Sequence, residues 1–411
     1  MNFNETHGGQ LARRTLLEES QLEDCMSMAW LLLCTFLVVS MQLGFAMLEV
    51  GSVREAHRMT VLAKNVLDSV VSCMVWWVRC TFWQTPSIVV ELSSGVMRPH
   101  LLMFHWAFCA TCVTICSGSM AERTHMLAYL CHAAVVAGVI YPCIADSAWG
   151  REGLFHNEFH SRWNSGYIFH DFAGSGVVHI TGGISALTGN LLLGRRIVKP
   201  QGSVDGGLLE QPIGTGPLAA RRNRSGDQGS ATTPPMPPRE KDLQDLEEQE
   251  DEQVMAVKPM GGWNRRFCDD RLDAQEFRAC NYLQIMGMFT LWFGWYGFNA
   301  GLTVGTHFSH VSAASTVSWN TTLAACTGGF GAYLFCYLFH SHLDIAFLTN
   351  GVLSGLVAIT GPCDVASDTA AVAIGLTAGL VVYPASSRLL RWLKLDDPVD
   401  AIAVHACSGL F

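Results

Sequence analysis

The chain has 411 residues, of which half are hydrophobic and only 15% are charged. Its mean hydropathy of +0.26 indicates a polytopic membrane protein and excludes an ordinary soluble domain. The net charge of −9 says little about the fold, because much of the acid lies in one long loop. Several of the 15 cysteines lie inside apolar runs, where they behave as small hydrophobic residues, so we expect no metal and no cofactor.

The first half of the chain contains five apolar runs, which predict a first repeat over residues 26–194. Residues 1–25 lack the basic start and short apolar core of a signal peptide, so we expect no cleaved signal there. The positive-inside rule, applied below, predicts that this N-terminal segment is extracellular. The second run is short and ends at Arg79, and residues 79–98 break the pattern. The predicted helices are 26–48, 66–78, 100–120, 126–146 and 171–194.

The fifth run carries the clearest candidate site. After Asp171 it has 23 uncharged residues, about the ~20 needed to cross a bilayer. His179 lies near its middle, and an ionisable residue at that depth is a functional-site hypothesis. Asp171 can cap the helix, while Gly174, Gly182 and Gly183 allow close approach of another helix.

The long segment 195–280 interrupts the apolar pattern. It contains the proline cluster 234–238 and the acidic run 247–252, which predict a low-complexity, disordered insertion. Basic residues lie in alternate loops, so the positive-inside rule predicts that this insertion is cytoplasmic and the N-terminus outside. Those basic residues are Arg54, Arg58, Lys64, Arg123, Arg195, Arg196, Lys199, Arg388, Arg391 and Lys394.

The second half, 281–411, repeats the arrangement with runs at 281–304, 311–339, 346–362 and 369–387. A tenth run begins near Pro398 and holds His405, and the chain stops six residues later, so we expect an incomplete tenth helix. Five runs separate the two histidines, which gives the halves opposite orientations. The expected fold is therefore an all-α, inverted five-plus-five repeat, with His179 and His405 sharing one site.

Three motifs carry a resemblance to a known family: the run from Asp171 to Arg196, Trp292–Gly301 and Asn350–Thr360. With the acid-to-histidine pattern of the tenth run, the sequence resembles the Amt/Mep/Rh ammonium transporters, and the Amt branch most. The resemblance implies a homotrimer, one narrow apolar pore per subunit, and ammonium that loses its proton at entry.

The resemblance also assigns roles to single residues. His179 and His405 would line the pore, Phe108 and Phe298 would form its stacked gate, and Asn299 would be structural. Phe104 and Trp149 would recruit substrate, with Asp171 near the mouth. The alternative for any one aromatic residue is plain packing or interface anchoring.

Leu302 departs from the family, many of whose members have a hydroxyl there, so Leu302→Ser is predicted to tighten ammonium binding. The alternative function is a non-transporting, degenerate or truncated member that acts as an ammonium sensor or membrane scaffold. We expect no enzyme activity, because no nucleophile–base pair or P-loop is present, and no nucleic-acid partner. The expected location is the lipid bilayer of the plasma membrane.

Overall fold

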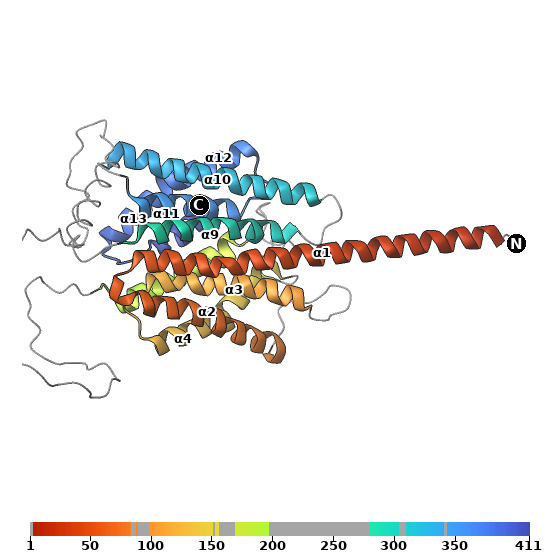
Figure 1. The fold of residues 1–411 in the computed structure, drawn as a ribbon, viewed down its shortest axis with the longest axis horizontal. Helices are drawn as coiled ribbons and strands as arrows, with labels where there is room; N and C mark the ends of the chain where they lie inside the picture. Colours follow the sequence, from red (N-terminus) through yellow and green to blue (C-terminus); the bar gives the residue numbers. More distant parts are fainter. Residues whose placement is uncertain are drawn as a thin grey trace, which may run out of the picture. The chain divides into compact units, whose positions relative to one another are not determined.

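The computed structural model describes residues 3–83, 88, 98–150, 153–155, 169–196, 279–303, 310–340 and 343–411. Every regular element in these ranges is helical, and the helices form one bundle (Figure 1). The insertion predicted at 195–280 lies outside the described residues from 197 to 278. Most of the atypical segment 79–98 lies outside them as well.

The first half contains the five predicted helical stretches. They are α1 (Phe3–Ser52); α2 (Arg58–Val78), after the short η1 (Glu55–His57) and continued by η2 (Arg79–Trp83); α3 (Pro99–Ser119); α4 (Met126–Val135), η4 (Val136–Ile140) and α5 (Tyr141–Trp149); and η5 (Ser175–Ile180) with α7 (Thr181–Leu193).

The second half contains the matching set. Its helices are α9 (Asn281–Ala300) with η7 (Gly301–Thr303); α10 (His310–Phe339); α11 (Ile345–Thr360); α12 (Asp368–Thr377), η8 (Ala378–Val382) and α13 (Tyr383–Trp392); and η9 (Ile402–Cys407) with α14 (Ser408–Leu410).

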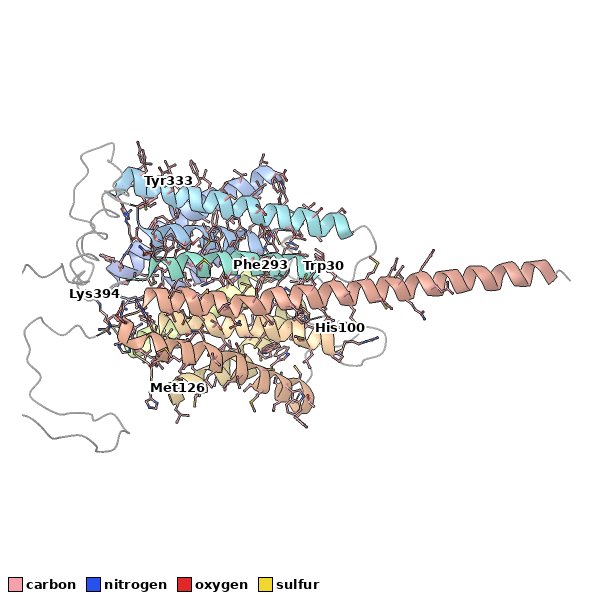
Figure 2. The ribbon with its side chains drawn as sticks, in the orientation of Figure 1. Trp30, His100, Met126, Phe293, Tyr333 and Lys394 are labelled. Carbon is pink, nitrogen blue, oxygen red and sulfur yellow. The ribbon has the colours of Figure 1, made fainter. Side chains whose placement is uncertain are left out.

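Within the described ranges, seven helices are long and apolar enough to cross a membrane. Large hydrophobic side chains are exposed, for example Leu192 at 84% and Phe293 at 58%; Figure 2 labels Phe293 on α9. Exposure of so many large apolar side chains is unfavourable in water but favourable against the lipid tails of a bilayer. The chain is therefore a multi-pass membrane protein.

The predicted bounds of the second helix, 66–78, were wrong at both ends. The helix begins at Arg58 and passes Arg79 to reach Trp83, so Lys64 lies on a helix rather than in a loop. Its ammonium group is accommodated because it donates to the carbonyl of Thr124 at 2.9 Å and lies 5.3 Å from the ring centre of Tyr129. A count of charges cannot foresee such partners. The first helix also begins earlier than residue 26, at Phe3.

The two halves repeat each other in detail. A π-helical turn interrupts the fourth stretch just before Tyr141-Pro142, and another interrupts the ninth just before Tyr383-Pro384. The histidine-bearing stretches likewise begin with the π-helical turns η5 and η9. These paired irregularities support the inverted-repeat fold, since unrelated halves would have no reason to share them.

Glycines let the first helices of the two halves, α1 and α9, pack side by side (Figure 1). A Cβ on Gly44 would lie 2.9 Å from the backbone nitrogen of Leu291, and one on Gly287 would lie 2.6 Å from that of Leu48. Neighbouring backbone cannot move as a side chain can. These positions therefore need glycine for close helix packing.

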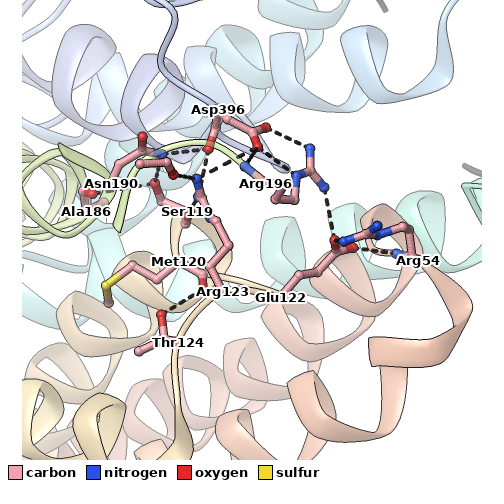
Figure 3. A network of polar contacts seen from close by, with 11 residues as sticks. Arg54, Ser119, Met120, Glu122, Arg123, Thr124, Ala186, Asn190, Arg196 and Asp396 are labelled. Atoms are coloured by element: carbon pink, nitrogen blue, oxygen red, sulfur yellow. Dashed lines mark hydrogen bonds and ion pairs between the residues drawn. The ribbon is translucent and has the colours of Figure 1, made fainter. Parts of the chain in front are cut away.

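A polar network joins both halves at one end of the bundle (Figure 3). Arg196 donates from Nε and Nη2 to the two carboxylate oxygens of Asp396, at 2.9 and 2.8 Å. Its Nη1 lies 3.5 Å from Glu122, which also accepts hydrogen bonds from the backbone and the guanidinium of Arg54. Three predicted basic loops, represented by Arg54, Arg123 and Arg196, thus lie at the same end.

Candidate functional site

The helix that begins after Asp171 is set by its carboxylate. Asp171 accepts hydrogen bonds from the backbone N–H groups of Gly174, Gly176 and Val177 at 2.8–2.9 Å. Gly174 has φ +100°, and a Cβ there would be strained and would lie 3.2 Å from the ring of Trp149. Because these backbone groups occupy both of its oxygens, Asp171 holds the geometry of the helix start.

The tenth stretch uses the same device. Asp397 accepts a hydrogen bond from the N–H of Ile402, five residues on, as Asp171 does from Gly176. His405 follows Asp397 by eight residues and His179 follows Asp171 by eight. The histidines therefore hold equivalent places in the two repeats.

The two histidines meet inside the bundle. Their Nδ1 atoms are 3.2 Å apart and their ring centres 5.2 Å apart, and both side chains are buried. One Nδ1 must carry hydrogen and donate to the other, because two N–H groups cannot face each other at this distance. The Nε2 of His179 has no hydrogen-bond partner among the described residues. The pair thus offers an unused nitrogen.

Close packing allows this meeting. A Cβ on Gly183 would lie 2.4 Å from the backbone nitrogen of Ala406, the residue after His405. A Cβ on Gly182 would lie 2.9 Å from the carbonyl oxygen of Cys112 on α3. Each glycine thus brings α7 against a backbone that a larger residue would displace.

A stack of rings leads to the histidine pair. Phe108 on α3 and Phe298 on α9 stack with centroids 4.1 Å apart and an interplanar angle of 8°. The ring of His179 lies 5.4 Å from Phe298 and 5.1 Å from Trp295, which it stacks upon. Trp295 is held by a hydrogen bond to Thr360 at 2.9 Å. Trp295 lies within the Trp292–Gly301 motif, but sequence analysis assigned it no role.

Phe104, Phe108 and Trp149 form a cluster that shares the Phe108 ring with this stack. The ring centre of Phe108 lies 4.7 Å from that of Phe104 and 6.1 Å from that of Trp149. The indole N–H of Trp149 donates to the carbonyl oxygen of Asp171 at 2.7 Å, which ties the cluster to the helix start. The structure adds His105, which contacts all three rings and was not predicted. We call these four residues the outer aromatic cluster.

Beyond His405 lies a cavity with room for about 20 Å³, enough for a water-sized molecule. Its lining is mostly apolar but includes His405, Asn350 and the buried Glu49. One oxygen of Glu49 accepts hydrogen bonds from Asn65 and Ser117, both at 2.8 Å. Sequence reasoning missed Glu49, because a single acid at the end of an apolar run has the pattern of a helix terminus.

The remaining predicted residues border this arrangement. Asn299 is buried and donates to Thr321 at 2.9 Å, next to Phe298 in the chain. Leu302 lies in η7 and packs partly buried against the core. The arrangement can attract a small cation to aromatic faces and can offer imidazole nitrogen, and the rings of Phe108 and Phe298 stack directly against each other.

Fold and site define a polytopic, inverted-repeat membrane protein with an enclosed histidine pair. Residues 29–210 and 268–411 match the family described as Ammonium Transporter Family. The chain belongs to that family.

Individual relatives agree with this assignment. The chain is 33% identical over 409 residues to "Ammonium transporter Amt2" of Archaeoglobus fulgidus, covering 96% of this chain and 71% of that protein. It is 29% identical to "Ammonium transporter 1 member 3" of Solanum lycopersicum, covering 95% and 74%.

Solved structures share the fold. The "Sensor Amt Protein" matches with a TM-score of 0.68 at 23% identity, covering 95% of this chain and 82% of that one. Mep2 of Candida albicans matches with a TM-score of 0.63 at 20% identity, covering 93% and 70%. The all-α transporter fold predicted from the sequence is therefore confirmed.

Proposed function

We propose that the chain transports ammonium across a membrane, through an apolar pore that passes the histidine pair. The observation that carries this proposal is the continuous column of rings from Phe108 and Phe298 to His179 and His405. Family membership supports the substrate, and the exposed apolar surface supports the membrane setting.

Recruitment would take place at the outer aromatic cluster. Aromatic faces attract a small cation by up to ~2 kcal/mol when it is desolvated. Phe104 and Trp149 would supply such faces, and the stacked rings of Phe108 and Phe298 would close the path behind them. Asp171 would act through the helix start and Trp149, because its carboxylate is occupied by backbone N–H groups.

The proton must leave before the rings are passed. A bare ion in an apolar tube is disfavoured by on the order of tens of kcal/mol, far more than the aromatic attraction returns. Ammonium can lose a proton and continue as ammonia, whereas potassium cannot. The Nε2 of His179, which has no partner among the described residues, would offer a nitrogen to ammonia, and the 3.2 Å contact between the two Nδ1 atoms would link the histidines for relay of the released proton.

Uptake by the purified chain in liposomes tests the proposal. We expect saturable ammonium uptake that potassium does not replace. His179→Leu with His405→Leu should lower this uptake strongly, because both polar wall groups are lost. Absence of uptake by a folded wild-type chain would overturn transport and favour a sensor or scaffold. If the double variant takes up ammonium as the wild type does, the pore does not pass the histidine pair.

We further infer a homotrimer in the plasma membrane, from the family resemblance. Mass measurement of the detergent-solubilised protein should give three chains per particle. Fractionation of cellular membranes tests the location, and recovery only with internal membranes would contradict it.

A further inference from the structure

His105 is a buried polar residue with no function in the arrangement described so far. It lies on α3, beside the rings of Phe104 and Phe108, with 6% of its surface exposed. Its Nδ1 has no hydrogen-bond partner among the described residues. A buried nitrogen without a partner destabilises a protein, so its presence calls for an explanation.

The surroundings of His105 are suited to a small cation with N–H groups. Its ring centre lies 5.7 Å from that of Phe104, 6.4 Å from Phe108 and 6.1 Å from Trp149. Three aromatic faces attract positive charge of any kind. A neutral imidazole adds what they lack, a nitrogen lone pair that accepts a hydrogen bond.

The short helix η7 packs against another part of the cluster. A Cβ on Gly301 would lie 2.6 Å from the ring of Phe104, so η7 packs directly against this ring. The next residue in η7 is Leu302, which is apolar. A ligand beside Phe104 would therefore have η7 near one part of that ring and the imidazole of His105, whose centre lies 5.7 Å from the ring centre, near another.

We propose that His105 is the hydrogen-bond acceptor for ammonium in the outer aromatic cluster, in place of a side chain at position 302. This assignment rests on the proposed function, because it names a further binding residue of the same site. It also explains how the site distinguishes ions. Potassium meets the same rings but has no hydrogen to donate to the imidazole.

Variants of the full chain separate this role from a structural one. His105→Leu keeps the bulk and loses the acceptor, whereas His105→Gln keeps an acceptor. One hydrogen bond to a charged group corresponds to roughly ten- to a hundredfold in affinity. We therefore expect His105→Leu to weaken ammonium binding by about that factor, and His105→Gln to retain most of it. The matched control is His132→Leu on α4, where a histidine with an unpartnered Nδ1 lies beside the ring of Tyr129 and outside the outer aromatic cluster.

A rescue provides the sharper test. Adding Leu302→Ser to His105→Leu should restore affinity, because a hydroxyl would then face the site from η7. In the wild type the same change should strengthen binding less, since His105 already accepts. A defect in folding would not be repaired by a serine on another helix.

Binding is measured by the ammonium-dependent rise in the thermal midpoint of the purified protein, with potassium chloride at equal concentration as reference. Wild-type affinity in His105→Leu, or a loss that Leu302→Ser does not restore, would overturn the assignment. A wild-type chain that ammonium does not stabilise would also overturn it. Binding with the expected variant pattern but without liposome uptake would refute transport and leave His105 as the acceptor.

Discussion

Replacing Arg196 with methionine would break the polar network that joins the two halves of the chain. The side chains of Arg196 and Asp396 are only 9% and 10% exposed. Two hydrogen bonds of 2.8–2.9 Å link the guanidinium of Arg196 to the carboxylate of Asp396. Removing one partner of a buried pair costs about 3–5 kcal/mol, because the other charge stays buried. Arg123, with Nη1 3.8 Å from Asp396, remains nearby, so we expect about 3 kcal/mol, the lower end of that range.

A double-mutant cycle measures this value. Reversible unfolding in mixed detergent micelles would be compared for the wild type, Arg196→Met, Asp396→Asn and the double variant. The double variant should be about 3 kcal/mol more stable than the sum of the two single losses predicts. Additive losses would mean that the two side chains act independently, and would refute the reasoning.

The pH dependence gives a second check on the same pair. Burial raises the pKa of Asp396, but hydrogen bonds and charge from Arg196 lower it by more than burial raises it. The pKa of Asp396 in the folded protein therefore lies below its usual value. A lowered pKa contributes stability that is present above the unfolded value of about 3.9 and is lost as pH falls through the folded value. The stability difference between the wild type and Arg196→Met should therefore be constant near neutrality and shrink below about pH 4. A difference that grows in acid would contradict this assignment.

Three further predictions concern the pore, the packing and the topology. Phe298→Ala should remove the ring stacked 4.1 Å from Phe108 and allow potassium to pass; liposome fluxes showing unchanged selectivity would contradict a gate. Gly183→Ala should lower the thermal midpoint more than Gly138→Ala does. The Cβ added at Gly183 would lie 2.4 Å from the backbone of Ala406, whereas the one added at Gly138 would lie 2.8 Å from the Val75 side chain, which can move. Equal midpoints for the two variants would refute this. Protease added outside right-side-out vesicles should not cut within 195–280, and cleavage there would reverse the predicted topology.

The sequence alone determined the number and order of the helical stretches, because hydropathy registers the lipid environment directly. It also paired His179 with His405, since an ionisable residue is rare in an apolar run and each histidine follows an acid at the start of its run. Charge counting failed for the second helix. Lys64 and Arg79 looked like stops, yet Lys64 is held on the helix by the Thr124 carbonyl and the Tyr129 ring.

Only the tertiary structure decided which side chains on one helix share a site. Most of α3 is buried around its whole circumference, so its sequence has no polar face to mark the side toward the pore. His105 therefore reads as one polar residue among many buried ones. Its neighbours Phe104 and Phe108 are close in sequence, but Trp149 comes from α5, and the unpartnered nitrogen becomes evident only when all three rings surround it. Helix packing creates that environment, and no local pattern encodes it.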